Sequence, residues 1–182
     1  PDFDAPVSHP IEGPLELAFK KNLEIVNGSV HLFKSEKDLF NNLSQFLSSN
    51  NKENICCNEI EIQNQLQKFQ VPFSNCPELP KDIEIGITSC EFLIAHTGSV
   101  MVSSAQKGGR QMFIYPPVHV VIAHKNQLTD FLESAYRGIQ EKYKENLPSQ
   151  ITLITGPSRT ADIEKTLILG AHGPKELHVF LV

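Results

Sequence analysis

The sequence predicts an α/β fold with three layers, formed by a single domain over residues 1–182. Apolar runs typical of strands alternate with segments of helical periodicity, which is the order of a βαβ sheet with helices on both sides. One run, Val118–Ala123, is almost continuously apolar, as expected for a strand covered on both faces. A chain of 182 residues is also long enough to bury a sizeable core.

In the first half, residues 1–14 contain four prolines and are expected to form an extended arm. A strand is expected over 30–33, and a helix from Ser35, because Ser35 and Asp38 suit a helix start. Helical spacing places five apolar residues on one face of this helix: Leu39, Phe40, Leu43, Phe46 and Leu47.

A short strand over 54–57, a second helix over 59–69 and a loop with three prolines over 71–80 are expected next. The sequence Thr88-Ser89-Cys90-Glu91 then fits a capping box at a helix start. This reading favours a structural role for Glu91 over a catalytic one.

Strands over 92–95 and 100–102 are expected to flank a tight turn. After the strand at 118–123, the segment 128–143 follows helical spacing, with charged residues away from one apolar stripe. We expect this stripe to lie in the core, so that a charged residue in place of Leu132 unfolds the domain.

The closing segment contains two glycine-proline turns. An apolar strand over 151–155 stops at Gly156, and the polar turn Ser158-Arg159-Thr160 opens a stretch of helical appearance that ends at Gly170. A second turn, which includes His172, leads into a last apolar run. This order predicts strand, helix and strand.

A turn between a strand and a helix at the carboxyl edge of a sheet is where open α/β folds bind ligands. The helix N-terminus favours an anion, and an arginine supplies a forked donor for carboxylate or phosphate. We therefore expect a small anionic ligand to contact residues of this turn: Gly156, Ser158, Arg159, Thr160 and Asp162. The alternative is that Ser158 or Thr160 caps the helix while Arg159 points into water.

The opposite wall of the predicted pocket is formed by Thr97, Gly98 and Ser99, with Arg110 on a glycine-rich loop. His172 is a further candidate, but a helix of this length would hold it roughly 15 Å from the first turn at ~1.5 Å per residue. The turn over residues 171–174 could instead fold back towards a neighbouring strand, or a second copy of the chain, in a homodimer, could supply His172.

Three histidines lie singly along the chain and show no metal-ligand spacing: His96, His119 and His172. Because His119 lies inside the apolar strand, we expect a hydrogen-bonded core histidine there, with ligand contact as the alternative. We expect the protein to bind no metal.

Charge and composition exclude some classes of protein. The net charge is -5, and the 16 basic residues are scattered, which argues against nucleic acid as the main partner. No apolar stretch approaches the ~20 residues of a membrane span, and no signal-peptide pattern is present, so a cytoplasmic protein is expected. The chain begins at Pro1 without an initiating methionine, and we expect it to be a trimmed form.

The four cysteines, Cys56, Cys57, Cys76 and Cys90, form no Cys-x-x-Cys pair. Zinc-ribbon and iron–sulfur spacings are therefore absent, and we expect reduced thiols and no bound cofactor.

Three stretches resemble the LUD-domain family, in the branch that serves lactate utilisation: GITSCEFLIAHTGS, YPPVHVVIA and ITGPSRTADIEKTLILGAHGPKELHVFLV. The resemblance covers residues 83–182 and is most specific in the closing stretch. It implies an α/β/α sandwich similar to the sugar-phosphate isomerase and coenzyme A transferase group. His96 stands where the family usually has glutamate, so we do not assign the carboxylate chemistry of transferase-like relatives to this position.

The resemblance also implies a function. Members belong to a bacterial system that oxidises L-lactate to pyruvate, with an iron–sulfur oxidoreductase subunit and a second LUD protein that carries ferredoxin-like clusters. We expect this chain to be an accessory or ligand-binding subunit of such a system. The alternatives are a free-standing enzyme on a small phosphorylated or acyl substrate, and a small-molecule sensor.

Overall fold

The computed structural model describes residues 10–49, 53–161, 167–170 and 172–182. At its centre is a parallel sheet with strand order β1-β11-β6-β3-β2, formed by β1 (Ser29–Leu32), β2 (Ile55–Cys56), β3 (Ile85–Thr88), β6 (Val118–Ala123) and β11 (Glu176–Leu181). A second sheet has the order β7-β4-β5-β8, formed by β4 (Phe92–Ile94), β5 (Ser99–Ser103), β7 (Leu128–Thr129) and β8 (Ile151–Ile154). The predicted α/β class is confirmed.

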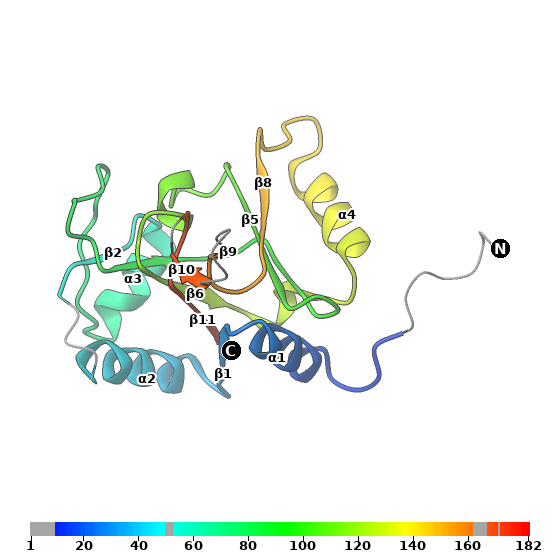
Figure 1. Ribbon diagram of the computed structural model, residues 1–182, viewed down its shortest axis with the longest axis horizontal. Coiled ribbons are helices and arrows are strands. Elements are labelled where there is room, and N and C mark those ends of the chain that lie inside the picture. The colour runs from blue at the N-terminus through cyan, green and yellow to red at the C-terminus, as the bar shows by residue number, and fades with distance from the viewer. Residues whose placement is uncertain (1–9, 50–52, 162–166, 171) are drawn as a thin grey trace.

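Helices cover these sheets in layers (Figure 1). Helices α2 (Glu36–Ser49) and α3 (Ile60–Lys68) pack on one face of the parallel sheet, and α1 (Leu15–Ile25) packs with the second sheet on the other face. Helix α4 (Leu132–Tyr143) lies on the outer face of the second sheet. Two short 3-10 helices are η1 (Arg110–Phe113) and η2 (Lys125–Gln127). Among the described residues, no helix has the length and apolar character that a membrane span requires.

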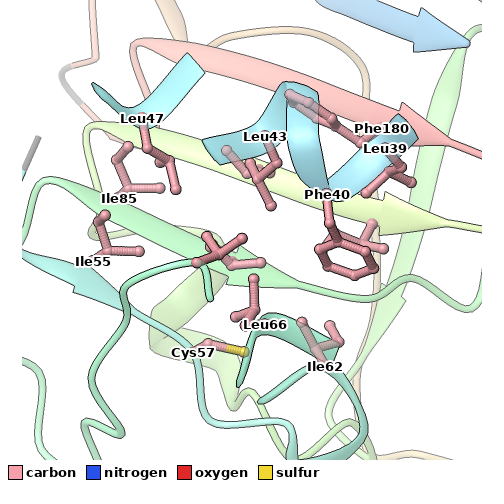
Figure 2. Close-up of a cluster of buried hydrophobic side chains, with 14 of the residues drawn as sticks. Leu39, Phe40, Leu43, Leu47, Ile55, Cys57, Ile62, Leu66, Ile85 and Phe180 are labelled. Carbon is pink, nitrogen blue, oxygen red and sulfur yellow. The ribbon is translucent and has the colours of Figure 1, made fainter. Parts of the chain in front are cut away.

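The largest cluster of buried side chains lies between the parallel sheet and the pair α2 and α3. Figure 2 shows Leu39, Leu43 and Leu47 of α2 in this cluster with residues of α3, β3 and β11. The predicted apolar face of α2 is therefore confirmed. So is its start, because the Asp38 amide donates to Ser35 Oγ at 3.2 Å, and Ser35 Oγ donates to the Asp38 carboxylate at 2.7 Å.

The central strand β6 is buried along its whole length, as its composition predicted. Val118, Val120 and Ile122 face α2 and α3, while Val121 and Ala123 face the second layer. A strand with one polar face could not occupy this place, because both faces are removed from water.

Two features of the chain before β4 differ from expectation: a helix that was not predicted, and a predicted capping box that is absent. Helix α1 follows the arm, and Phe19 and Leu23, one helical turn apart, are its buried residues. Thr88 ends β3, and the chain passes through Ser89 and Cys90 into β4, so the predicted capping box is wrong. Of the predicted arm, residues 10–14 form no helix or strand, and residues 1–9 lie outside the described part.

The closing segment is the largest correction. Strand β8 does not join the parallel sheet but pairs antiparallel with β5, and β6 pairs directly with β11. The predicted helix after Ser158 is also wrong, because β9 (Arg159–Ala161) and β10 (Leu167–Leu169) form an antiparallel pair. Helical spacing in a short segment does not exclude a strand pair, since tertiary packing overrides weak local preference.

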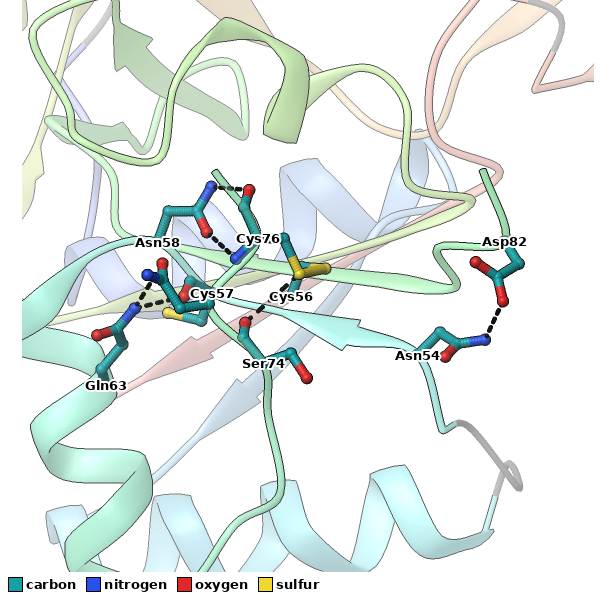
Figure 3. The surroundings of a disulfide bond; sticks show 9 residues. Asn54, Cys56, Cys57, Asn58, Gln63, Ser74, Cys76 and Asp82 are labelled. Carbon is teal, nitrogen blue, oxygen red and sulfur yellow. Dashed lines mark hydrogen bonds between the residues drawn. A yellow bond between two sulfur atoms is a disulfide. The ribbon is translucent and has the colours of Figure 1, made fainter. Parts of the chain in front are cut away.

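The cysteines also differ from the prediction of reduced thiols. Cys56 and Cys76 form a disulfide, which ties β2 to the proline-rich loop (Figure 3). Asn58 supports the same loop, donating to the Cys76 carbonyl and accepting from its amide, each at 2.8 Å. Cys57 and Cys90 are free and buried, and burial raises the pKa of the Cys57 thiol to about 12. The pairing follows from strand placement, which cysteine spacing alone does not reveal.

Helix α4 begins at Leu132, after the short strand β7, and its buried residues are Ala135 and Ile139. They pack against Ile94 and Met101 of the second sheet. The expectation that Leu132 is buried is wrong, because its relative exposure is 47%.

Helix α4 generates a matched pair of stability tests. Ile139→Ala removes a fully buried side chain and is expected to lower the free energy of unfolding by about 2–5 kcal/mol. Leu132→Ala on the same helix is expected to change it by less than ~0.5 kcal/mol. Urea denaturation of the two variants measures both values. A larger loss for Leu132→Ala than for Ile139→Ala would contradict this placement of the helix.

Candidate functional site

The hairpin of β9 and β10 brings the two glycine turns together. The Ser158 amide donates to the Pro174 carbonyl at 2.8 Å, and the Gly170 amide donates to the Ser158 carbonyl at 3.0 Å. A Cβ atom at Gly173 would lie 3.2 Å from Ser158 Cβ. The separation of roughly 15 Å that a helix would impose is therefore absent, and no second copy of the chain is needed to bring His172 near Ser158.

These turns border a pocket of about 320 Å³, here called the amino-edge pocket. It is lined by Arg110, Phe113, Ile114, Gln150, Thr152, Leu153, Ile154, Thr155, Gly156, Ser158, His172, Gly173 and Pro174. Pro174 lies just before β11, and its neighbour Lys175 bonds to Pro117, just before β6. The pocket thus lies by the amino ends of these strands, and the prediction of a site at the carboxyl edge is wrong for this turn.

Arg110, Gly156, Ser158 and His172 are the predicted site residues that the fold gathers around this pocket. Arg110 begins η1 and donates from Nη2 to Ser149 Oγ at 2.6 Å. Both Arg110 and His172 are exposed to solvent. No aspartate or glutamate is among the described residues that line the pocket, and Arg110 supplies a positive charge there.

The residues of the predicted opposite wall do not line the pocket themselves but connect to it through Thr155. Thr97 Oγ1 and Ser99 Oγ are 2.7 Å apart, and Ser99 Oγ is 2.7 Å from Thr155 Oγ1, which lines the pocket. Gly98 has a φ of 64° and packs so closely on the backbone of α1 that a Cβ would lie 2.3 Å from the Leu23 nitrogen. Gly98 is therefore required by packing.

Arg159, a predicted site residue, and His96 lie away from the pocket lining. The Arg159 guanidinium donates to the Val26 carbonyl at the end of α1. His96 is exposed, with its ring 5.1 Å from that of Phe131. Asp162 and the side chain of Thr160 lie outside the described part of the chain.

His119 is a core residue, as the first of its two readings predicted. It is fully buried, and desolvation lowers the pKa of its imidazole to about 4. Its Nε2 lies 2.8 Å from Thr88 Oγ1, whose own hydrogen is donated to the Ser89 carbonyl at 2.9 Å. Nε2 must therefore be the donor, which leaves Nδ1 as a lone pair with no partner among the described residues. His119 does not line the amino-edge pocket.

A second cavity, which the sequence did not predict, lies at the carboxyl ends of the parallel strands. This carboxyl-edge cleft has a volume of about 460 Å³. It is lined by Glu36, Leu39, Phe40, Glu61, Ile62, Gln65, Ser89, Cys90, Ile122, His124, Asn126, Gln127, Lys142 and Val182. Each of the five strands is followed in the chain by one of these residues, which is where open α/β sheets bind ligands.

Behind the cleft, two carboxylates are joined by a chain of hydrogen bonds. Glu59 accepts from the Ser89 amide at 2.9 Å and from Ser89 Oγ. Gln106 donates to Ser89 Oγ at 2.9 Å and accepts from the Ser103 amide at 2.9 Å. Ser103 Oγ donates to Glu91 at 2.6 Å. The chain links the end of β3 to the end of β5.

The two carboxylates experience opposite environments. Burial raises the pKa of Glu59, and the hydrogen bonds from Ser89 offset this only in part. Burial alone would also raise the pKa of Glu91, but hydrogen bonds from Lys142, Ser103 and Tyr143 outweigh it and hold that pKa below its usual value. Lys142 Nζ and Tyr143 OH each lie 2.7 Å from a Glu91 oxygen. Glu91 therefore fastens α4 to the second sheet.

Sequence reasoning missed this network because its members come from separate elements. Glu91 follows β3, while Lys142 and Tyr143 end α4, about 50 residues later. Among the described residues, no group of three histidine, cysteine, aspartate or glutamate side chains is arranged to hold a metal ion.

The lowered pKa of Glu91 predicts a pH-dependent stability. An ionised Glu91 stabilises the fold above its usual pKa, near ~4.3, and this contribution is lost as pH falls through the lower folded value. Glu91→Gln is expected to cost about 2 kcal/mol at neutral pH, and the difference from the original protein should shrink in acid. Glu133→Gln, which breaks the exposed pair with Arg137, is the control and should cost less than ~0.5 kcal/mol. Denaturation curves across pH measure this, and a pH-independent difference would contradict it.

The family model described as LUD domain matches residues 17–182. A lactate utilization protein C from Halalkalibacterium halodurans is 35% identical over 99 residues, which cover 53% of this chain and 43% of that protein. One from Shouchella clausii is 37% identical over 92 residues, covering 50% and 40%. An uncharacterized protein from Neisseria meningitidis serogroup B is 36% identical over 102 residues, covering 56% and 43%.

The matched part spans less than half the length of these relatives. A solved structure, a DUF162 family protein from Deinococcus radiodurans, has a TM-score of 0.68 and 15% sequence identity. It covers 92% of this chain and 96% of that one, so the likeness of fold extends across the molecule. The resemblance first seen over residues 83–182 thus extends to most of the chain, which belongs to the LUD-domain family.

Proposed function

We propose that this chain is the ligand-binding subunit of a bacterial system that oxidises L-lactate to pyruvate, and that it holds a small organic anion in the amino-edge pocket. Several relatives are named lactate utilization protein C, and that name is the source of the proposed system. The bound anion would be a short carboxylate of the kind that such a system uses or produces.

The observation that carries the proposal is the charge of the pocket lining. Arg110 and His172 both line it, with no acidic residue among the described lining residues. A guanidinium presents parallel donors that match a carboxylate, and its Ser149 contact leaves further N–H groups available. The hydroxyls of Thr155 and Ser158 add neutral donors on the same lining.

The carboxyl-edge cleft is a poorer site for an anion. Glu36 and Glu61 line it, and Lys142 is already paired with Glu91. Like charge disfavours a carboxylate ligand in that cleft. Helix N-termini do not change this balance, because α2 and α3 each carry acidic residues in their first turn.

The rest of the pocket lining includes apolar side chains, which suit the uncharged part of a small organic acid. Phe113, Ile114, Ile154 and Pro174 offer apolar surface next to the cation. A pocket of about 320 Å³ lies at the lower end of the size range for small-molecule sites. A short hydroxy or keto acid combines one charged end with a small apolar end, as this lining requires.

In this proposal, the iron–sulfur subunits of the system carry the electrons and this chain supplies a binding site beside them in the cytoplasm. Its described cysteines are buried or paired, with Cys56 and Cys76 in the disulfide.

Arg110→Ala is expected to weaken binding of L-lactate or pyruvate by about 1.5–3 kcal/mol, roughly 10- to 150-fold in Kd, because it removes a charge-assisted hydrogen bond. Arg159→Ala is the matched control, since Arg159 contacts Val26 and does not line the pocket. Isothermal titration calorimetry with each acid measures the affinities. The proposal fails if Arg159→Ala loses affinity while Arg110→Ala keeps it, or if the unaltered protein binds neither acid.

A further inference from the structure

The carboxyl-edge cleft is separate from the proposed anion site. It contains a serine whose hydroxyl donates to a carboxylate. Ser89 follows the last residue of β3 and lines the cleft. Its side chain is half-buried, so it is partly accessible from the cavity. A residue directly after a central parallel strand is held in place by the sheet behind it.

Glu59 lies against this serine, although it belongs to another element. It is the residue before α3, but its side chain makes no capping hydrogen bond with that helix. Its two oxygens accept instead from the amide and the hydroxyl of Ser89. The hydroxyl hydrogen of Ser89 is thus directed at a carboxylate, which is the arrangement of a nucleophile and its base.

Neighbouring groups fix this pair. A Cβ atom at Gly108 would lie 3.0 Å from Glu59 Oε1, so the glycine loop closes directly over the carboxylate. Gln106 donates to Ser89 Oγ at 2.9 Å and occupies one of its two lone pairs. One lone pair of Ser89 Oγ remains for attack. Burial that raises the pKa of Glu59 also makes it a stronger base.

The other walls of the cleft indicate the class of substrate. Leu39, Phe40, Ile62 and Ile122 form an apolar side, which suits a short acyl chain. Lys142 lines the same cleft and is paired with Glu91, but that contact uses one of the three ammonium donors, so the others are available to a developing oxyanion. The acidic rim formed by Glu36 and Glu61 favours a neutral substrate over an anionic one.

We propose that Ser89 is a nucleophile towards short-chain carboxylic esters, with Glu59 as its base. Ser89 Oγ forms a bond to the ester carbonyl carbon while its proton passes to Glu59. The bond to the alcohol oxygen breaks, and Glu59 returns the proton to the departing alkoxide. Water then attacks the acyl-serine, gives its proton to Glu59, and releases the carboxylic acid as Ser89 regains its hydrogen.

The test uses the whole chain, a fluorophosphonate probe that reacts with activated serines, and p-nitrophenyl acetate. We expect one covalent adduct per chain, located on Ser89 by peptide mass spectrometry, and hydrolysis of the ester. Ser89→Ala should remove both signals. Glu59→Gln, which keeps the shape of the side chain, should slow labelling roughly 100-fold or more, the range for loss of a general base.

Ser104→Ala is the matched control, because Ser104 bonds to Ser149 and Gln150 and does not line the cleft. It should label at the original rate, and circular dichroism should show that all three variants fold. The proposal is overturned if the folded protein forms no adduct on Ser89, or if Glu59→Gln labels as fast as the original chain. Because these probes do not involve the amino-edge pocket, the result is independent of binding of lactate or pyruvate there.

Discussion

The parallel pairing of β11, β6 and β3 is the constraint on which the rest of this structure depends. Every residue of β6 is buried, and its two faces contact different layers. Because all five strands run in one direction, their carboxyl ends meet at one edge and their amino ends at the other. The two cavities lie at these two edges and are therefore separated by the length of the strands.

The two edges differ in charge, and this difference divides their chemistry. Helices α2 and α3 begin at the carboxyl edge with acidic residues, which complement the helix dipoles and leave Glu36 and Glu61 around the cleft. At the amino edge, the turns before β6 and β11 contribute Arg110 and His172 instead. We therefore propose an anionic ligand at one end of the sheet and a neutral ligand at the other.

Segments with regular periodicity and full burial were predictable from sequence. The apolar run of β6 and the face of α2 containing Leu39 and Leu43 both follow from one-dimensional patterns. Sequence patterns also single out Gly156, Ser158, His172 and Arg110, all of which line the amino-edge pocket, although no pattern places them together.

What could not be predicted depends on partners that are distant in the chain. The segment after Ser158 has helical spacing, but backbone pairing of β9 with β10 overrides it, and that pairing brings His172 to the pocket. In the sequence Glu91 resembles a capping residue, but in the structure it accepts hydrogen bonds from Lys142 and Tyr143 of α4. Likewise, the pairing of Cys56 with Cys76 depends on where β2 places the first cysteine, which spacing does not show.

Nuclear magnetic resonance tests the division between the two edges most directly. Titration of the ¹⁵N-labelled chain with pyruvate should shift the backbone amides of Gly156, Ser158 and Gly173 at the amino edge. The amides of Ser89 and Gln127, in the carboxyl-edge cleft, should stay unchanged. Shifts confined to Ser89, Gln127 and their neighbours would place the anion at the carboxyl edge and contradict the account.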